Sequence, residues 1–175
     1  YGVSILAHLY RYRKEERFLT AAREAARFLM AIQSDDGAFP VCPDPEKGPA
    51  GNERFTFDTS MCTMGLMDLY QVDPNEAVLH SAQRAARWLL SMQRDDGSFH
   101  ARAQPGQGPI PTGNFFGDGS CIHVKNAMAL YKVADVDGDA EMIRGGERAC
   151  SYAISLQSDE GFFWAMPSRD FVFSH

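Results

Sequence analysis

Residues 84–99, RAARWLLSMQRDDGSF, decide the fold, because the chain contains this pattern three times. The other copies are residues 24–39, EAARFLMAIQSDDGAF, and residues 148–163, RACSYAISLQSDEGFF. Each copy ends with a glutamine, then two acidic residues, a glycine and a phenylalanine. The glutamines are Gln33, Gln93 and Gln157, at a spacing of about 60 residues. A recurring unit of this size predicts a repeat architecture, in which each unit packs against the next.

Each copy has the apolar spacing of a helix. In the middle copy Ala85, Trp88, Leu89 and Met92 recur at i, i+3, i+4 and i+7, which places them on one helix face. Gly97 follows the helix end, where a left-handed residue closes the last turn. The aromatic positions of the three copies, Phe28, Trp88 and Tyr152, are therefore expected to be buried at equivalent places.

The whole chain is predicted to form six helices in three antiparallel hairpins, with no sheet of three or more strands. The helices are expected at about residues 1–12, 18–33, 58–70, 74–93, 120–132 and 139–157. Asp73 is the expected N-cap of the fourth helix, with Pro74 at its first position. Short turns join the helices within a hairpin, and loops of about 25 residues join the hairpins. All long loops leave from the same end, so they should gather on one face with the N-termini of the third and fifth helices.

Composition excludes several classes of partner. The net charge is −6 and no basic cluster exceeds residues 11–14, so nucleic acid is not expected to bind. The sequence has no run of about 18 apolar residues, so no membrane span is expected. The four cysteines form no CxxC pair, which favours reduced thiols and a cytoplasmic location. The sequence begins inside a helical pattern and ends on DFVFSH, so we interpret it as part of a longer chain.

The repeat also resembles a known family. The pattern RAxxWLxxxQ at residues 84–93, followed by GxF at residues 97–99, resembles the glutamine–aromatic repeat of the terpenoid cyclase and protein prenyltransferase α/α toroids. The wider (α/α)6 group, which includes many polysaccharide lyases, epimerases and hydrolases, has similar hairpins. This chain departs from the motif in having Phe39, Phe99 and Phe163 where the cyclases prefer tryptophan, and Glu24 where they prefer a basic residue.

The resemblance implies an all-α fold, an α/α toroid in which three hairpins form about half of an (α/α)6 barrel. Residues 1–175 would be one domain, with repeats at about residues 1–39, 59–99 and 120–163. Helices 1–12, 59–70 and 120–132 would lie inside and the repeat helices outside. The resemblance further implies that the remaining half of the ring comes from the same chain or from another subunit.

Two aspartates and a histidine are the candidate catalytic residues. Asp58 and Asp118 occupy matching places just before the third and fifth helices, and His123 follows in the first turn of the fifth. One interpretation makes the aspartates helix caps and His123 a packing residue. The other makes the aspartates an acid–base pair at the mouth of a cavity and His123 a proton shuttle.

Metal sites are weaker interpretations. Protein prenyltransferases hold zinc with an Asp, a Cys two residues on and a distant His, but Asp118 and Cys121 are three apart and the His could only be His175. Residues 135–139, DVDGD, have glycine at the fourth position rather than the sixth of a calcium loop, so a capped turn is expected. No metal and no cofactor are predicted.

The long-loop face mixes aromatic and charged residues, which suits a sugar with apolar faces and a hydroxylated rim. Helix N-termini and basic side chains there favour an anionic sugar such as a uronate. The predicted substrate-binding residues are Glu53, Arg54, Phe57, Asn114, Phe116, Lys125, Trp164 and His175.

The predicted function is therefore a carbohydrate-active enzyme, a lyase, epimerase or hydrolase acting on a poly- or oligosaccharide. One alternative is an isoprenoid cyclase or prenyltransferase-like domain, whose cavity should instead hold one isolated acid among aromatic and aliphatic residues. The other is a non-catalytic helical scaffold, although scaffold repeats have short connections on both sides.

Overall fold

The computed structural model describes residues 1–41, 53–112, 116–169 and 172–173. Its six α-helices are α1 (Gly2–Arg13), α2 (Glu16–Ile32), α3 (Thr56–Val72), α4 (Glu76–Ser91), α5 (Lys125–Asp137) and α6 (Ala140–Ser155). A short 3-10 helix, η2 (Cys121–Val124), leads into α5. The strands are β1 (Arg54–Phe55), β2 (Arg102–Gln104), β3 (Gly108–Pro109), β4 (Phe163–Trp164) and β5 (Val172–Phe173). The six predicted helices are therefore confirmed.

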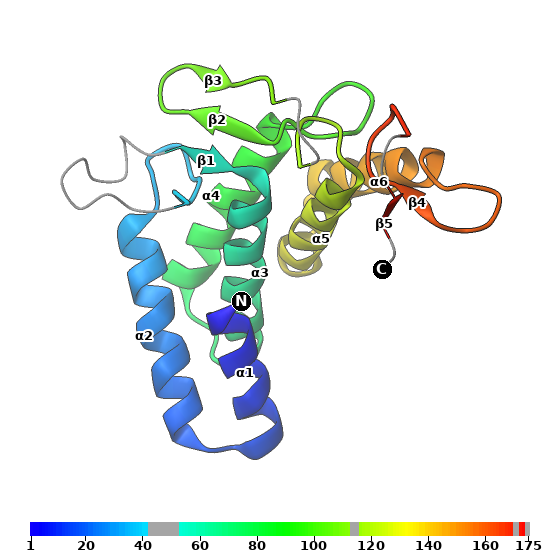
Figure 1. The fold of residues 1–175 in the computed structure, drawn as a ribbon. Helices are drawn as coiled ribbons and strands as arrows, with labels where there is room; N and C mark the ends of the chain where they lie inside the picture. The colour runs from blue at the N-terminus through cyan, green and yellow to red at the C-terminus, as the bar shows by residue number, and fades with distance from the viewer. Residues whose placement is uncertain (42–52, 113–115, 170–171, 174–175) are drawn as a thin grey trace.

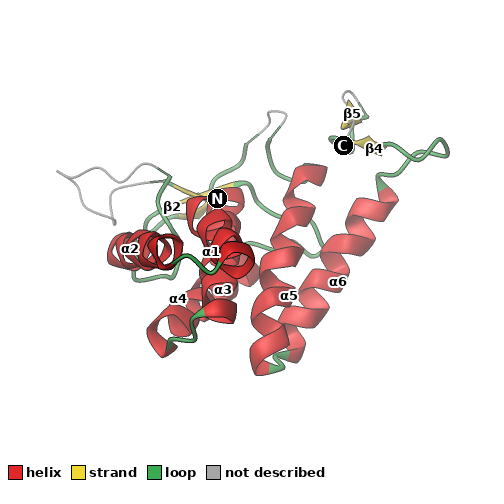
Figure 2. Cartoon of the chain, turned by 90° about the horizontal axis from the view of Figure 1, so that it is seen from below, coloured by secondary structure: helices red, strands yellow, loops and turns green. Residues whose placement is uncertain are grey.

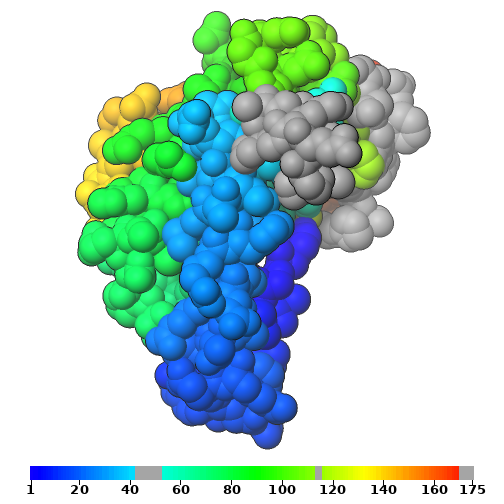
Figure 3. Space-filling view, turned by 90° about the vertical axis from the view of Figure 1, so that its left-hand side faces the viewer, coloured from blue at the N-terminus to red at the C-terminus, as the bar shows by residue number. Residues whose placement is uncertain are grey.

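The helices form three antiparallel hairpins arranged in two layers (Figure 1). α3 packs against α1 and α5, its neighbours in one layer, and against its own partner α4 in the other. Figure 3 shows α2 and α4 together on an outer face of the molecule. This is the layering of an α/α toroid, with α1, α3 and α5 inside and α2, α4 and α6 outside, as predicted.

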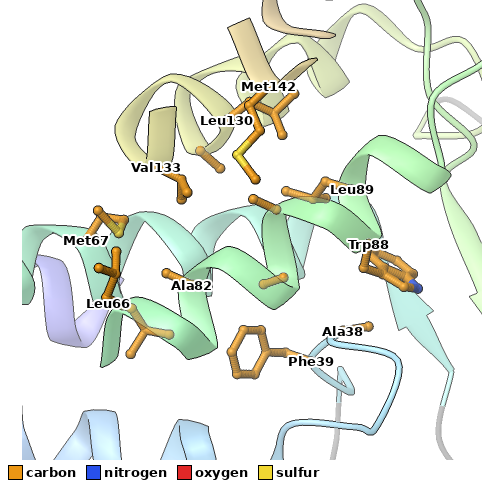
Figure 4. Packing of buried hydrophobic residues seen from close by; sticks show 14 of the residues in the cluster. Ala38, Phe39, Leu66, Met67, Ala82, Trp88, Leu89, Leu130, Val133 and Met142 are labelled. Atoms are coloured by element: carbon orange, nitrogen blue, oxygen red, sulfur yellow. The ribbon is translucent and has the colours of Figure 1, made fainter. Parts of the chain in front are cut away.

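One continuous core joins the three hairpins. Leu66 and Met67 of α3, Leu89 of α4, Leu130 of α5 and Met142 of α6 are all fully buried within it (Figure 4). Each such side chain contributes about 1.5–3 kcal/mol of burial free energy. The core therefore depends on contacts between hairpins as much as on contacts within them.

The repeated glutamine ties each hairpin to the next. Gln33 Nε2 donates to Gly37 O at 2.7 Å and to Ser81 O of α4 at 2.9 Å, and its Oε1 accepts from Arg84 Nη2 at 2.6 Å. Gln93 repeats the arrangement, since its Nε2 bonds Gly97 O and Gly145 O of α6.

The second arginine completes the repeat, because Arg148 Nη2 donates to Gln93 Oε1 at 2.5 Å. In both cases the arginine lies three residues beyond the residue whose carbonyl accepts. The sequence motif is thus the connector between consecutive hairpins.

The glycine of each motif allows the same close approach. Gly37 and Gly97 have φ of +98° and +87°, which L side chains rarely adopt. A Cβ added to Gly37 would lie 2.5 Å from Arg84 O, and one added to Gly97 would lie 2.5 Å from Arg148 O. These turns therefore need glycine for two reasons, conformation and space.

The expected burial of the three aromatic positions is wrong for Phe28. Phe28 is 57% exposed, whereas Trp88 is 7% exposed and Tyr152 is half-buried. The Tyr152 hydroxyl donates to Gly119 O at 2.6 Å, in the loop that precedes its hairpin. Phe28 has no hydroxyl and therefore makes no such hydrogen bond. The equivalence of the three aromatic positions is therefore limited to the second and third hairpins.

A small sheet also forms, contrary to prediction. β2 pairs antiparallel with β1 (Phe55 opposite Arg102) and with β3 (Gln104 opposite Gly108), and β4 pairs with β5. The strands have two or three residues each and come from the long loops. They satisfy main-chain groups that would otherwise lie unpaired above the helix ends.

The long loops gather at one end of the hairpins, as predicted. Figure 1 shows β1, β2 and β3 above α3 and α4, opposite the turn that joins α1 to α2. Figure 2 likewise shows the strands on one side of the helices and the turn between α5 and α6 on the other. The candidate site is therefore expected at the long-loop end. None of the described helices combines the length and the apolar composition needed to cross a bilayer.

Candidate functional site

The N-terminus of α3 and the loop before η2 meet at the main chain of Ala101. Thr56 N and Thr56 Oγ1 both contact Ala101 O, at 3.0 and 3.2 Å. Asp118 Oδ1 accepts from Ala101 N at 2.7 Å, and Asp118 Oδ2 accepts from His100 Nδ1 at 3.0 Å. One residue of the second long loop thus joins α3 to Asp118.

His123 lies beneath this junction and is 3% exposed. Its Nε2 is 3.2 Å from both Phe116 O and Gly117 O, and its Nδ1 is 3.4 Å from Thr56 Oγ1. Since carbonyls only accept, Nε2 carries a proton, and Nδ1 lies against the Thr56 hydroxyl, whose single hydrogen can go either to Nδ1 or to Ala101 O. Burial lowers the pKa of His123 despite the carbonyls and nearby Asp118, which act to raise it. This environment matches the packing-residue interpretation better than that of a proton shuttle.

Asp58 is the third residue of α3 and is partly exposed. Burial raises the pKa of its carboxyl above the ordinary value, because the surroundings disfavour the charged form. A carboxyl in this condition holds its proton to higher pH, which is what a general acid requires. Among the carboxyls that the structure describes on this face, Asp58 therefore has the raised pKa that suits a general acid.

The cap interpretation of the two aspartates is not what the structure shows. The N-cap of α3 is Phe55 and that of η2 is Ser120, and neither helix has a side-chain cap hydrogen bond. Asp118 instead holds the Ala101 main chain and His100. Within the described ranges, no hydrogen bond joins Asp58 to Asp118 or to His123. The structure therefore places Asp118 and His123 in one network and Asp58 outside it.

Among the predicted substrate-binding residues, Phe57 and Lys125 lie together. The Lys125 ammonium is 5.5 Å from the centroid of the Phe57 ring, a cation–π contact between the first turns of α3 and α5. Ser60 Oγ donates to Lys125 O at 3.3 Å and fixes the two helix starts side by side. Phe116, in the loop that precedes η2, is 55% exposed. This cluster presents an aromatic ring and a cation at the long-loop end.

Three other predicted residues have structural partners. Arg102 Nη1 lies 3.1 Å from a Glu53 carboxylate oxygen, and Arg54, which is buried, lies 3.1 Å from an Asp36 oxygen. Trp164 packs edge-on against Phe162, with ring centroids 5.0 Å apart. These contacts hold the loops, so the three side chains are less available to a ligand than predicted. Asn114 and His175 lie outside the described residues.

The sequence reasoning missed several residues of this region and one of the interior. His100, Thr56 and Arg102 carry the loop network, and only their long-range partners reveal it. Asp68 of α3, 5% exposed, accepts from Lys132 Nζ of α5 at 2.5 Å and from the Ser4 hydroxyl of α1. A charged residue in the middle of an apolar inner helix was the available signal.

The metal interpretations concern the same residues. Across the described part of the chain, no three His, Cys, Asp or Glu side chains are grouped as ligands for one ion. The carboxylate of Asp118 is engaged with His100 and Ala101, and Cys121 is a free, buried thiol. In the turn at residues 135–139, Asp139 caps α6 by accepting from Glu141 N and Met142 N, so the predicted capped turn is confirmed.

The acidic turns of the repeats border hollows on this side. One of about 310 Å³ lies between residues 33–36, Arg54 and the β2–β3 turn. Another of about 430 Å³ lies between residues 93–96 and His100. They adjoin the loop network without containing Asp58, Asp118 or His123.

Comparison with solved structures supports the fold. A sugar epimerase from a ruminal bacterium matches with a TM-score of 0.73 at 11% identity, over 97% of this chain and 46% of that one. Cellobiose 2-epimerase from Bacillus thermoamylovorans matches with a TM-score of 0.75 at 10% identity, over 95% and 44%. A glycoside hydrolase family 76 mannosidase from Bacteroides thetaiotaomicron matches with a TM-score of 0.69 at 13% identity, over 98% and 46%.

These matches show that the chain has the α/α-toroid fold and spans about half the length of the solved structures. At such low identity they show the fold alone. No protein-family model matches the chain.

Proposed function

We propose that this chain is part of a carbohydrate-active enzyme of the α/α-toroid type, with its site on the long-loop face. The observation that carries the proposal is the cluster at the start of α3 and α5. There a partly buried carboxyl with a raised pKa, Asp58, follows directly on Phe57, whose ring contacts Lys125. The similarity to sugar epimerases and a mannosidase supports the same class.

The substrate is a poly- or oligosaccharide, and the cluster favours one with uronate units. An aromatic ring offers an apolar platform for a sugar face, while an ammonium beside it attracts a carboxylate. The N-terminal end of the α3 dipole also favours negative charge. The isoprenoid alternative has less support, because its cavity should hold one isolated acid among aromatic and aliphatic residues, whereas here the carboxyl of Asp58 lies on a face that also carries the Lys125 ammonium.

In the reaction, Asp58 acts as the general acid and base, since its pKa is moved toward the working range. Asp118 is the candidate second carboxylate, and its hydrogen bonds to Ala101 N and His100 hold it in one orientation. His123, being enclosed, positions the loop at residues 116–117 against α3 rather than meeting the substrate. The same groups could serve a lyase, an epimerase or a hydrolase, which differ in where the proton goes.

The test is turnover by the full-length protein. It is incubated with polygalacturonate, alginate, glucuronoxylan, mannan and cellobiose, and products are followed as unsaturated ends, reducing ends and epimers. Turnover of a uronate polymer is expected, and Asp58→Asn should lower kcat by about 10²- to 10⁴-fold. Asp35→Asn, which changes an exposed carboxyl in the first acidic turn, is the matched control and should leave kcat unchanged.

A second variant tests the role of the ammonium. Lys125→Met should raise KM for the uronate substrate with little effect on kcat, because the ammonium binds ground state and transition state alike. The proposal fails if no saccharide is turned over, or if Asp58→Asn retains full activity on the substrate found.

A further inference from the structure

The third glutamine repeats the sequence of the connectors but not their contacts. Gln157 Nε2 donates to Gly161 O at 3.0 Å, as Gln33 and Gln93 do to the glycines of their own motifs. In the described part of the chain, its side chain makes neither of the other two contacts, to a carbonyl and to an arginine of a following helix. Gln157 is also exposed, whereas Gln33 is 9% exposed.

The glycine that follows gives an independent observation. Gly161 has a φ of +93°, close to the values of Gly37 and Gly97. A Cβ added there would meet nothing within 4 Å, whereas at Gly37 and Gly97 it would strike the carbonyl of the arginine in the next hairpin. The turn thus keeps the shape that admits a following helix, with open space in that helix's place.

The apolar residue three positions before each glutamine gives a third observation of an uncovered surface. Leu90 is the residue three positions before Gln93, and its side chain packs directly on Gly145 of the next hairpin. A Cβ added to Gly145 would lie 2.4 Å from Leu90 Cδ2. Ile154 stands in the same place before Gln157 and is 64% exposed. The helix that covers Leu90 is α6, which also supplies the carbonyl that accepts from Gln93. The residue with the accepting carbonyl is small both for Gln33 (Ser81) and for Gln93 (Gly145).

A second copy of the chain does not provide the missing helix. The residues of α2 that correspond to Ser81 and Arg84 are Ala21 and Glu24. Placed against Gln157, the Glu24 carboxylate would face the amide oxygen, and both groups are acceptors. Glu24 is instead paired with Arg27 on the surface of α2, at 3.7 Å.

We propose that the surface formed by Ile154, Gln157 and Gly161 is the docking site for one more helical hairpin of the same construction. Its outer helix carries a small residue, whose carbonyl accepts from Gln157 Nε2 and whose surface covers Ile154. Three residues later it carries an arginine, whose guanidinium donates to Gln157 Oε1 and whose carbonyl passes over Gly161. This occupant continues the contacts already made between the first and second hairpins and between the second and third.

The experiment places a photo-crosslinking residue, p-benzoylphenylalanine, at position 154 of the full-length protein and sequences the crosslinked peptides. The same residue at position 90 is the positive control and must crosslink to α6 near Gly145. Placed at position 87, on the exposed outer side of α4, it is the negative control. From position 154 we expect a crosslink to a helix with a small residue and an arginine three positions apart.

A crosslink to residues 16–32 of a second copy, or no crosslink when the positive control reacts, would overturn the proposal. Because the bulky probe itself could hinder docking, Gln157→Met is compared with Gln93→Met in thermal unfolding of the full-length protein. The proposal requires the two variants to lower Tm by similar amounts. If Gln157→Met lowers Tm by less than about a quarter of the amount found for Gln93→Met, the proposal is contradicted. Such a small shift is what an exposed glutamine with a single hydrogen bond would give.

Discussion

Replacing Gly97 by alanine should disrupt the junction between the second and third hairpins. Gly97 has a φ of +87°, and a Cβ there would lie 2.5 Å from Arg148 O and 2.9 Å from the carbonyl carbon of Arg148. Both the backbone conformation and the space are unsuited to a side chain. The neighbour is main chain within α6, so it cannot rotate away as a flexible side chain would.

The expected magnitude has two parts. Holding an L residue at positive φ costs about 1–2 kcal/mol. Forcing a methyl group into a closely packed junction costs about a further 1–3 kcal/mol. Gly138, at the end of α5, is the matched control, because it also has positive φ (+71°) but has nothing within 4 Å of an added Cβ.

The assay is urea unfolding and thermal unfolding followed by far-ultraviolet circular dichroism. Gly138→Ala should lose about 1–2 kcal/mol of unfolding free energy. Gly97→Ala should lose about 1–3 kcal/mol more than the control, which corresponds to a further drop in Tm of about 2–12 °C in a chain of this length. If the two variants unfold at the same denaturant concentration, the close approach between hairpins is not what constrains Gly97.

Three further predictions concern buried polar groups. Burial lowers the pKa of His123, so the free energy of unfolding should fall as pH drops below about 6.5, by up to about 1.4 kcal/mol per pH unit. In urea unfolding at several pH values, His123→Gln should not show this fall. Burial raises the pKa of Asp58, so the stability tied to its protonated form is complete below about pH 3.9 and is lost as pH rises through the raised value. Asp58→Asn should therefore gain stability relative to the parent chain over that rise, and a constant difference would contradict the assignment. Lys132→Met should cost about 3 kcal/mol by leaving Asp68 buried without its partner, and adding Asp68→Asn should recover part of the loss.

The helices could be predicted because their information is local. Apolar spacing and the glycine after each motif give the element and its end, and burial of residues such as Leu89 then follows. Boundaries are less determined where several residues suit one role. Asp73 was the expected cap of α4, but Asn75 accepts from Ala77 N at 2.9 Å, while Asp73 pairs with Arg23 of α2.

The candidate site could be predicted only in outline. The gathering of the loops and of Phe57 with Lys125 followed from topology. The partners of Asp118 and Arg54 did not, because they depend on how each long loop folds back on itself, and the partner of Glu53 did not, because it depends on how the two loops pair with each other across about 50 residues of sequence. No local pattern specifies such contacts, and the same holds for the small sheet.

The most direct test of the account is a nuclear magnetic resonance titration of the full-length protein with a uronate oligosaccharide. The account predicts that the amide shifts that change cluster at the starts of α3 and α5, around Phe57, Asp58 and Lys125, and that Lys125→Met weakens the titration. Changes confined to the opposite end of the hairpins, around Lys14 and Gly138, or no changes with any of the saccharides tried, would contradict a carbohydrate site on the long-loop face.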